Sequence, residues 1–162
     1  MRKLYITLIL GTLCLPLNAI KELCACSASS PLYTHFVYMF SHASFLHWAC
    51  NMWSLLVLHN LFRIPRLITA YLLAVAISFI PTSKPVLGLS VIVCFFMGYM
   101  AQYLWNKSHL GLCLTVASIW LSCILPGFAG IYHVFMFVFG CLYWQLLKLY
   151  CRIKDYGRDN ER

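Results

Sequence analysis

The chain has 162 residues, of which 62% are hydrophobic and 10% are charged, and its formal net charge is +8. A soluble domain carries about 25% charged residues, so this composition predicts a membrane protein and argues against an ordinary soluble domain. The basic residues lie between apolar runs and in the C-terminal tail, as topology signals do, so we expect no nucleic-acid partner.

Six apolar segments, separated by polar or proline-containing turns, predict an all-α membrane protein with six transmembrane helices. In chain order the segments are 4–17, 42–62, 67–80, 86–105, 110–125 and 128–150. The first follows a basic start and is either a retained helix, which we prefer, or a cleaved signal peptide. The third is short for a bilayer, which asks for about 20 apolar residues. This layout gives a six-helix membrane domain over 1–150 and a basic cytoplasmic tail over 151–162.

The distribution of positive charge orients the predicted bundle. If the N-terminus is inside, ten of the twelve Lys and Arg residues fall in inner segments and two, Lys21 and Lys84, fall in outer loops. Basic residues concentrate on the cytoplasmic side of membrane proteins. We therefore expect an integral multi-pass membrane protein with both termini cytoplasmic.

Scarce polar side chains recur at one depth of this predicted bundle. His42, His47 and Asn51 open the second segment, Ser90 opens the fourth, and His133 lies one to two turns into the sixth. All three segments start at the outer face in the predicted topology, which places these groups about 5–15 Å below it. Polar groups at membrane depth are costly and by default mark a functional site.

These residue types suggest serine chemistry. Serine is a poor nucleophile until a base removes its proton, and histidine is the usual base near neutral pH. His47 and Asn51 are four apart and share a helix face, where hydrogen-bond donors could stabilise an oxyanion. Gly88 would let the backbone turn sharply before Ser90. Each residue also has an ordinary explanation, because a lone serine often bonds to its own helical turn and a lone histidine often bonds a neighbouring helix.

A metal or haem site is the more distant alternative. His42, His47 and His133 could bind one, but they lack acidic or thiolate neighbours, so we expect no cofactor and no metal. Cys24 and Cys26 fit no common zinc spacing, and most other cysteines lie in apolar runs as small hydrophobes. The remaining histidines are interpreted as structural or solvated: His35, His59 and His109.

The order of these motifs resembles the rhomboid family of intramembrane serine proteases, over roughly 31–150. The family signature His-x4-His-x3-Asn is matched in full, its Gly-x-Ser-Gly or Gly-x-Ser-Ala motif is nearly matched, and a histidine follows near the start of the last segment. The matching residues are His42, His47, Asn51, Gly88-Leu89-Ser90-Val91 and His133.

The resemblance implies a Ser90–His133 dyad in which Ser90 attacks the scissile carbonyl and His133 acts as general base and then general acid. The Ser90 backbone N–H and the side chains of His47 and Asn51 would hold the oxyanion, while His42 and Gly88 would support the site. It implies no cofactor, and its substrates would be transmembrane or membrane-anchored proteins within a lipid bilayer. A bacterial inner (plasma) membrane location, with the active site opening to the outer face, is also implied; the oligomeric state is not readable.

Four positions depart from the family pattern. Val91 replaces the small residue after the nucleophile, and Cys94 stands where an aromatic ring often supports the histidine. Phe95 and Met136 are bulky where the fourth and sixth segments should approach closely, which predicts a longer contact within the dyad. This bulk supports an alternative, a catalytically impaired rhomboid-like protein that binds membrane-protein clients. Because both dyad residues are present, an active intramembrane serine endopeptidase is the preferred hypothesis.

Overall fold

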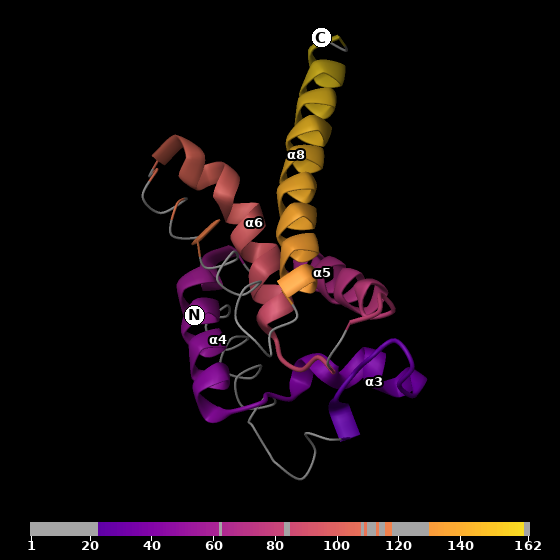
Figure 1. The fold of residues 1–162 in the computed structure, drawn as a ribbon. Coiled ribbons are helices and arrows are strands. Elements are labelled where there is room, and N and C mark those ends of the chain that lie inside the picture. The colour runs from indigo at the N-terminus through magenta and orange to yellow at the C-terminus, as the bar shows by residue number, and fades with distance from the viewer. Residues whose placement is uncertain are drawn as a thin grey trace.

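The computed structural model describes residues 23–61, 63–82, 85–107, 109, 113, 116–117 and 130–160. Regular structure in this part is helical, apart from one isolated bridge between Cys26 and Val86. The α-helices are α3 (Leu32–Val37), α4 (Phe45–Leu58), α5 (Ile64–Ile77), α6 (Ser90–Lys107) and α8 (Gly130–Asn160), with 3-10 turns η1 (Tyr38–Phe40) and η2 (His59–Leu61) (Figure 1).

The prediction of a six-transmembrane-helix bundle is wrong. Among the described residues, a single helical stretch, Gly130–Tyr156 within α8, is long and apolar enough to cross a membrane, by length and composition only. α4 and α5 have 14 residues each. At 1.5 Å per residue each is about 21 Å long, whereas the hydrocarbon core is about 30 Å thick. In α6 (Ser90–Lys107), the apolar stretch found among the described residues is Ser90–Gln102, which is also shorter than a candidate span.

The predicted multi-pass localisation is wrong for the same reason. With at most one candidate span in the described part of the chain, the inner and outer assignments of the loops lose their basis, including an active site that opens to the outer face of a bacterial inner membrane. The second, third, fourth and sixth predicted segments appear as α4, α5, α6 and α8. The first segment, and nearly all of the fifth, fall outside the described residues.

Local sequence explains why the helices begin and end where they do. The Ser44 side chain accepts a hydrogen bond from the His47 N–H, 3.2 Å, and so caps α4. Pro65 lies in the first turn of α5, where its missing N–H costs nothing. α5 ends at Ile77 with Ser78 as its C-cap, ahead of Pro81, which cannot continue a helix. These signals divide the apolar sequence into pieces shorter than a bilayer.

α6 and α8 lie side by side at the centre of the fold (Figure 1). Two glycines allow their backbones to touch. A Cβ added at Gly98 would lie 1.9 Å from the Phe137 carbonyl oxygen, and one at Gly140 would lie 2.0 Å from the Phe95 carbonyl oxygen. Any larger side chain at either position would force the helices apart.

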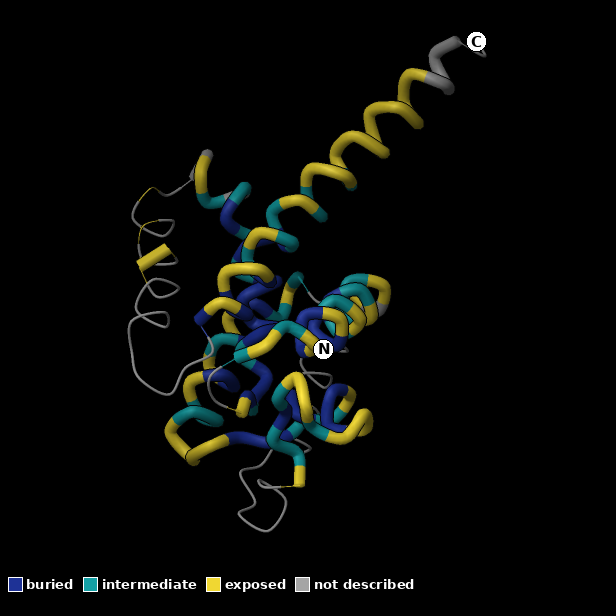
Figure 2. The backbone as a smooth tube through the Cα atoms, turned by 45° about the vertical axis from the view of Figure 1, so that its right-hand side comes forward, coloured by how far each residue is buried: buried dark blue, intermediate teal, exposed yellow. Residues whose placement is uncertain are grey.

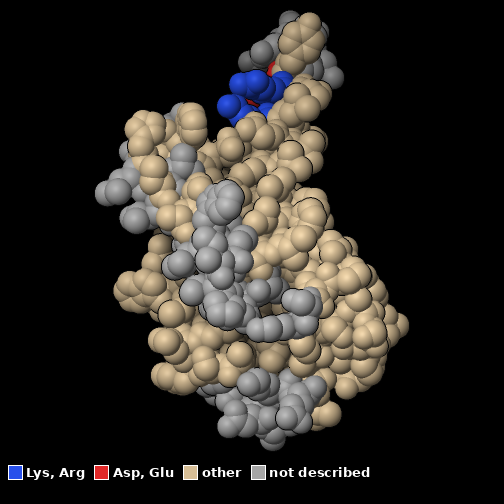
Figure 3. All heavy atoms as spheres, in the orientation of Figure 1, with Lys and Arg blue, Asp and Glu red and all other residues tan. Residues whose placement is uncertain are grey.

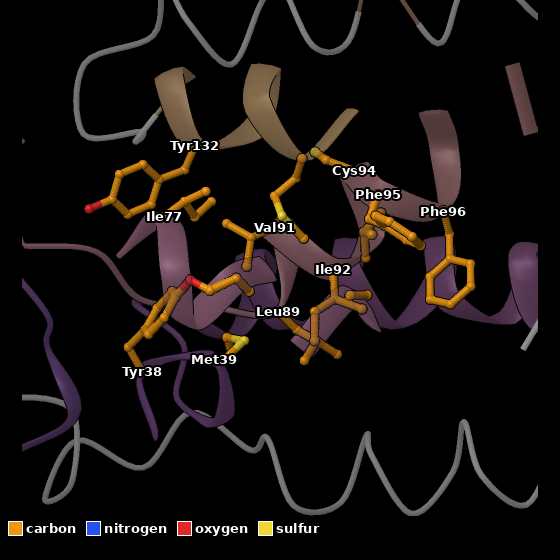
Figure 4. Packing of buried hydrophobic residues seen from close by; sticks show 14 of the residues in the cluster. Tyr38, Met39, Ile77, Leu89, Val91, Ile92, Cys94, Phe95, Phe96 and Tyr132 are labelled. Atoms are coloured by element: carbon orange, nitrogen blue, oxygen red, sulfur yellow. The ribbon is translucent and has the colours of Figure 1, made fainter. Parts of the chain in front are cut away.

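The hydrophobic core surrounds the first half of α6. Figure 4 shows its side chains among residues of α5, α8 and the segment before α4. Fully buried members of this core include Tyr38, Met39, Leu55, Leu89, Val91, Phe95, Phe96, Tyr132 and Met136. The core therefore packs directly behind the start of α6, which is the end that carries Ser90.

The C-terminal half of α8 extends beyond this core. It is largely exposed as far as Tyr156 (Figure 2), and the helix continues without a break past residue 150 to Asn160. Figure 3 shows basic side chains gathered near its C-terminal end, where Lys148, Arg152 and Lys154 are exposed. The same helix thus carries an apolar stretch and a basic end.

Candidate active site

Two helix starts bring Ser90 and His133 together. Ser90 is the first residue of α6 and His133 lies in the first turn of α8. The Ser90 Oγ and His133 Nε2 atoms are 2.8 Å apart, within hydrogen-bond reach, although 43 residues separate them in the sequence. His133 is 4% exposed and Ser90 is half-buried. This is the geometry in which a neutral imidazole can accept the serine proton.

The loop before Ser90 turns at Gly88. Its φ of +113° is the only positive value among the described residues, and it favours glycine. The Gly88 N–H donates to the Tyr38 carbonyl oxygen, 3.0 Å. A Cβ on Gly88 would lie 2.7 Å from Cε1 of His47, so the His47 ring lies directly against the loop backbone. Gly88 therefore allows both the turn of the backbone and the close approach of the His47 ring.

His42 holds the same loop from a second direction. Its Nε2 accepts a hydrogen bond from the Leu89 N–H, 3.4 Å, which assigns the ring proton to Nδ1. The ring is 1% exposed and meets the His47 ring edge to face, with centroids 5.2 Å apart. His42 thus supports the backbone next to Ser90.

His47 and Asn51 lie one turn apart on α4. Burial lowers the pKa of His47 below 6.5, which keeps the ring neutral with a single N–H to donate. Asn51 is 5% exposed, and its side-chain nitrogen is buried without a hydrogen-bond partner among the described residues. Leaving a buried donor unsatisfied costs about 1–3 kcal/mol. Such a donor is suited to a group that arrives only during a reaction, such as an oxyanion.

The predicted lengthening of the dyad contact is not observed. Val91, Phe95 and Met136 are fully buried and Cys94 is nearly so, all within the core. Close helix approach is provided instead by the two glycines, Gly98 and Gly140, further along α6 and α8. The bulky side chains of Val91, Phe95 and Met136 therefore fill the core beside α6 and α8 and do not lengthen the Ser90–His133 contact.

Sequence reasoning missed two contributors to the site. The Tyr38 backbone carbonyl accepts the Gly88 N–H, and Tyr132, next to His133, donates through its hydroxyl to the turn after α5. A backbone acceptor has no sequence signal at all. Tyr132 could have been suspected only from its position beside His133, since a tyrosine in an apolar run usually just packs.

No family model, curated protein or solved structure matches this chain. The resemblance to the rhomboid family therefore rests on the sequence motifs alone. No three His, Cys, Asp or Glu residues within the described ranges are grouped so that they could hold a metal ion.

Replacing Gly88 with alanine is expected to destabilise the fold and slow any reaction of Ser90. A non-glycine residue in such a backbone conformation costs about 1–3 kcal/mol, and the added Cβ would also displace the His47 ring. Thermal unfolding and the labelling rate of Ser90 by a fluorophosphonate would be measured together. A Gly88→Ala protein with the melting temperature and labelling rate of the wild type would contradict this interpretation.

Proposed function

We propose that this chain is a rhomboid-type serine endopeptidase that cleaves membrane-anchored polypeptides with a Ser90–His133 dyad. The single observation that carries the proposal is the 2.8 Å separation of Ser90 Oγ and His133 Nε2 across two helices. At this distance the imidazole can act as the base that takes the proton of the serine hydroxyl.

The proposed reaction proceeds in two halves. His133 Nε2 takes the Ser90 proton as Oγ attacks the scissile carbonyl carbon, and the resulting imidazolium returns that proton to the leaving amine. Water then attacks the acyl-enzyme with His133 again as base, and Ser90 is regenerated. The developing oxyanion is stabilised by the Ser90 N–H at the positive end of α6 and by donors from His47 and Asn51.

The position of the dyad supports a membrane-anchored substrate. His133 lies three residues after the start of the stretch Gly130–Tyr156, which is apolar and long enough to cross a membrane. A substrate segment that enters or leaves a membrane would meet the dyad at that end of α8. The test compares cleavage of a single-span model substrate in proteoliposomes with cleavage of the same peptide segment fused to a soluble protein. We expect faster cleavage of the anchored form; equal rates would contradict the substrate class.

A non-catalytic client-binding protein is the second candidate. It is favoured by Val91 and Met136, which are completely buried beside the dyad where rhomboid proteases carry small residues. This candidate predicts that Ser90→Ala leaves client binding and any cellular phenotype intact, whereas the protease predicts that the phenotype is lost.

The oxyanion role of Asn51 can be tested separately from its place in the fold. Asn51→Ala removes an unsatisfied buried donor, so the free energy of unfolding is expected to change little, whereas kcat is expected to fall about 100-fold or more. Urea unfolding and steady-state cleavage would be measured on the same preparation. A lower stability with normal kcat would show that Asn51 serves only the fold.

A further inference from the structure

Ser90 and His133 are connected by their hydrogen bond and also by a second route, which is a series of contacts through other residues. It begins at Val86, four residues before Ser90. The Val86 N–H donates to the Cys26 carbonyl oxygen, 2.7 Å, and the Cys26 N–H donates to the Val86 carbonyl oxygen, 3.1 Å. The loop that leads to the nucleophile is therefore tied to Cys26.

The Cys26 side chain continues the route into α5. Its Sγ is 3.3 Å from His35 Nδ1, and the same Nδ1 is 2.8 Å from the Ser78 Oγ. The Ser78 hydroxyl is also 2.6 Å from the Val75 carbonyl oxygen, an acceptor only. The Ser78 hydroxyl therefore donates its proton to the Val75 carbonyl oxygen. The His35 Nδ1–H in turn donates to the Ser78 Oγ and, more weakly, to the Cys26 Sγ.

This buried cluster is rigidly held. Cys26 and Ser78 are 0% exposed and His35 is 1% exposed, and the His35 ring stacks on Phe79 with centroids 4.0 Å apart. Burial also raises the pKa of the Cys26 thiol, so the thiol remains neutral and adds no charge to the cluster. No substrate can reach these groups in the folded chain, so they do not form a second active site.

Tyr132 completes the route at the start of α8. Its hydroxyl donates to the Ile80 carbonyl oxygen, 2.7 Å, and is shared with the Ser78 carbonyl oxygen, 3.1 Å. Tyr132 is 1% exposed and immediately precedes His133. The turn that ends α5 thus holds the end of α8 that carries the base.

The place of this route in the fold explains why the dyad needs it. α6 and α8 touch most closely at Gly98 and Gly140. Gly98 is eight residues from Ser90, or about 12 Å along the helix axis. The contacts at the two glycines do not by themselves fix the separation of Ser90 and His133, and a displacement of 1 Å can cost about 100-fold in rate.

We propose that Cys26, His35, Ser78 and Tyr132 form a positioning brace that sets the separation of Ser90 and His133. The inference rests on the proposed function, because the brace matters to rate only if the dyad is catalytic. Its members act through the loop at Val86 and through the backbone beside His133, and they are positioning residues rather than catalytic ones.

Tyr132→Phe tests the brace because it removes the hydroxyl and nothing else. We expect kcat for the anchored substrate to fall about 10- to 100-fold with KM unchanged within about twofold, since the base is displaced while substrate binding is not. Tyr71→Phe is the matched control: its hydroxyl also donates to a backbone carbonyl, that of Phe36, but outside the brace. The control should keep the wild-type kcat. An equal kcat in Tyr132→Phe and the wild type, with only a lower melting temperature, would overturn the proposal.

An independent measurement separates failure of the brace from failure of the proposed function. The protein would be labelled with 15N-histidine. Ser90→Ala alone should shift the His133 Nε2 resonance from its position in the wild type, because the Ser90–His133 hydrogen bond is lost. In the Tyr132→Phe background the same substitution should produce little further shift. A small further shift in the Tyr132→Phe background, together with no protease activity, would support the brace and reject the protease. An undiminished shift would reject the brace. If Tyr132→Phe does not fold, Ser78→Ala, with Ser78→Thr as the rescuing variant, gives the same two readouts.

Discussion

Ser90→Ala is expected to reduce kcat for an anchored substrate by at least about 1,000-fold while the fold is retained. The substitution removes the only atom that can form the acyl-enzyme. Ser90 is half-buried at the end of a helix, so the loss of its hydroxyl leaves no cavity in the core. Cleavage would be followed by gel assay in proteoliposomes, with circular dichroism of the same samples to show that the fold is retained.

Two comparisons make this prediction specific. His133→Asn should cost about as much as Ser90→Ala, and the double variant should be no worse than either, because the two residues act as one unit. Ser54→Ala makes the same chemical change on α4, where the Ser54 hydroxyl only donates to the Cys50 carbonyl oxygen, and should keep wild-type activity. Additive losses in the double variant would mean that the two side chains do not work together.

Gly98→Leu and Gly140→Leu are expected to destabilise the fold more than substitutions at exposed positions of α6 and α8. Each added Cβ would lie about 2 Å from a backbone carbonyl oxygen of the facing helix, so the helices themselves must move. Overpacking a well-packed site costs about 1–3 kcal/mol, and a backbone clash belongs at the upper end of that range. Activity should fall further than stability, because separation of α6 and α8 also separates Ser90 from His133.

Val138→Ala is the matched control for the two glycine substitutions. Val138 lies on α8 two residues before Gly140 but is exposed, so its truncation is expected to change the free energy of unfolding by less than about 0.5 kcal/mol. Unfolding by denaturant in detergent micelles would be compared for all three variants and the wild type. If the glycine variants unfolded at the same denaturant concentration as Val138→Ala, the close packing of α6 on α8 would be refuted.

Local features of the site were predictable from sequence because they depend on neighbouring residues. The spacing of His47 and Asn51 places both on one face of α4, and both lie on the same helix in the structure. Gly88 supplies a backbone turn that only glycine adopts easily, and α6 begins two residues later at Ser90. The pairing of Ser90 with His133 came from motif order, and their side chains are 2.8 Å apart.

The predicted membrane bundle failed because apolar composition does not distinguish a side chain that faces lipid from one that faces protein. Val91, Ile92, Phe95 and Phe96 form an apolar run in a predicted span, yet all four are buried against other helices. The Ser44 cap sets the start of α4 and Pro65 lies in the first turn of α5, and each of these helices has only 14 residues. The positive-inside bias then oriented predicted spans that α4 and α5 are too short to form.

The brace was not predictable for a different reason. Its contacts join residues that lie far apart in sequence, such as His35 with Ser78 and Tyr132 with Ile80. None of these residue types is unusual where it occurs, and His35 had been interpreted as an ordinary structural or solvated histidine. Only the folded arrangement brings a thiol, an imidazole, a hydroxyl and a phenol into one connected route.

We propose that Ser90 is a nucleophile activated by His133, and covalent labelling of Ser90 is the most direct test of this role. The purified protein would be treated with a fluorophosphonate and analysed by intact-protein and peptide mass spectrometry. We expect one phosphonyl adduct, located on Ser90. This adduct should be lost in His133→Asn although the serine remains. No adduct on folded wild-type protein, an adduct on another residue, or labelling of Ser90 at the wild-type rate without His133, would contradict it.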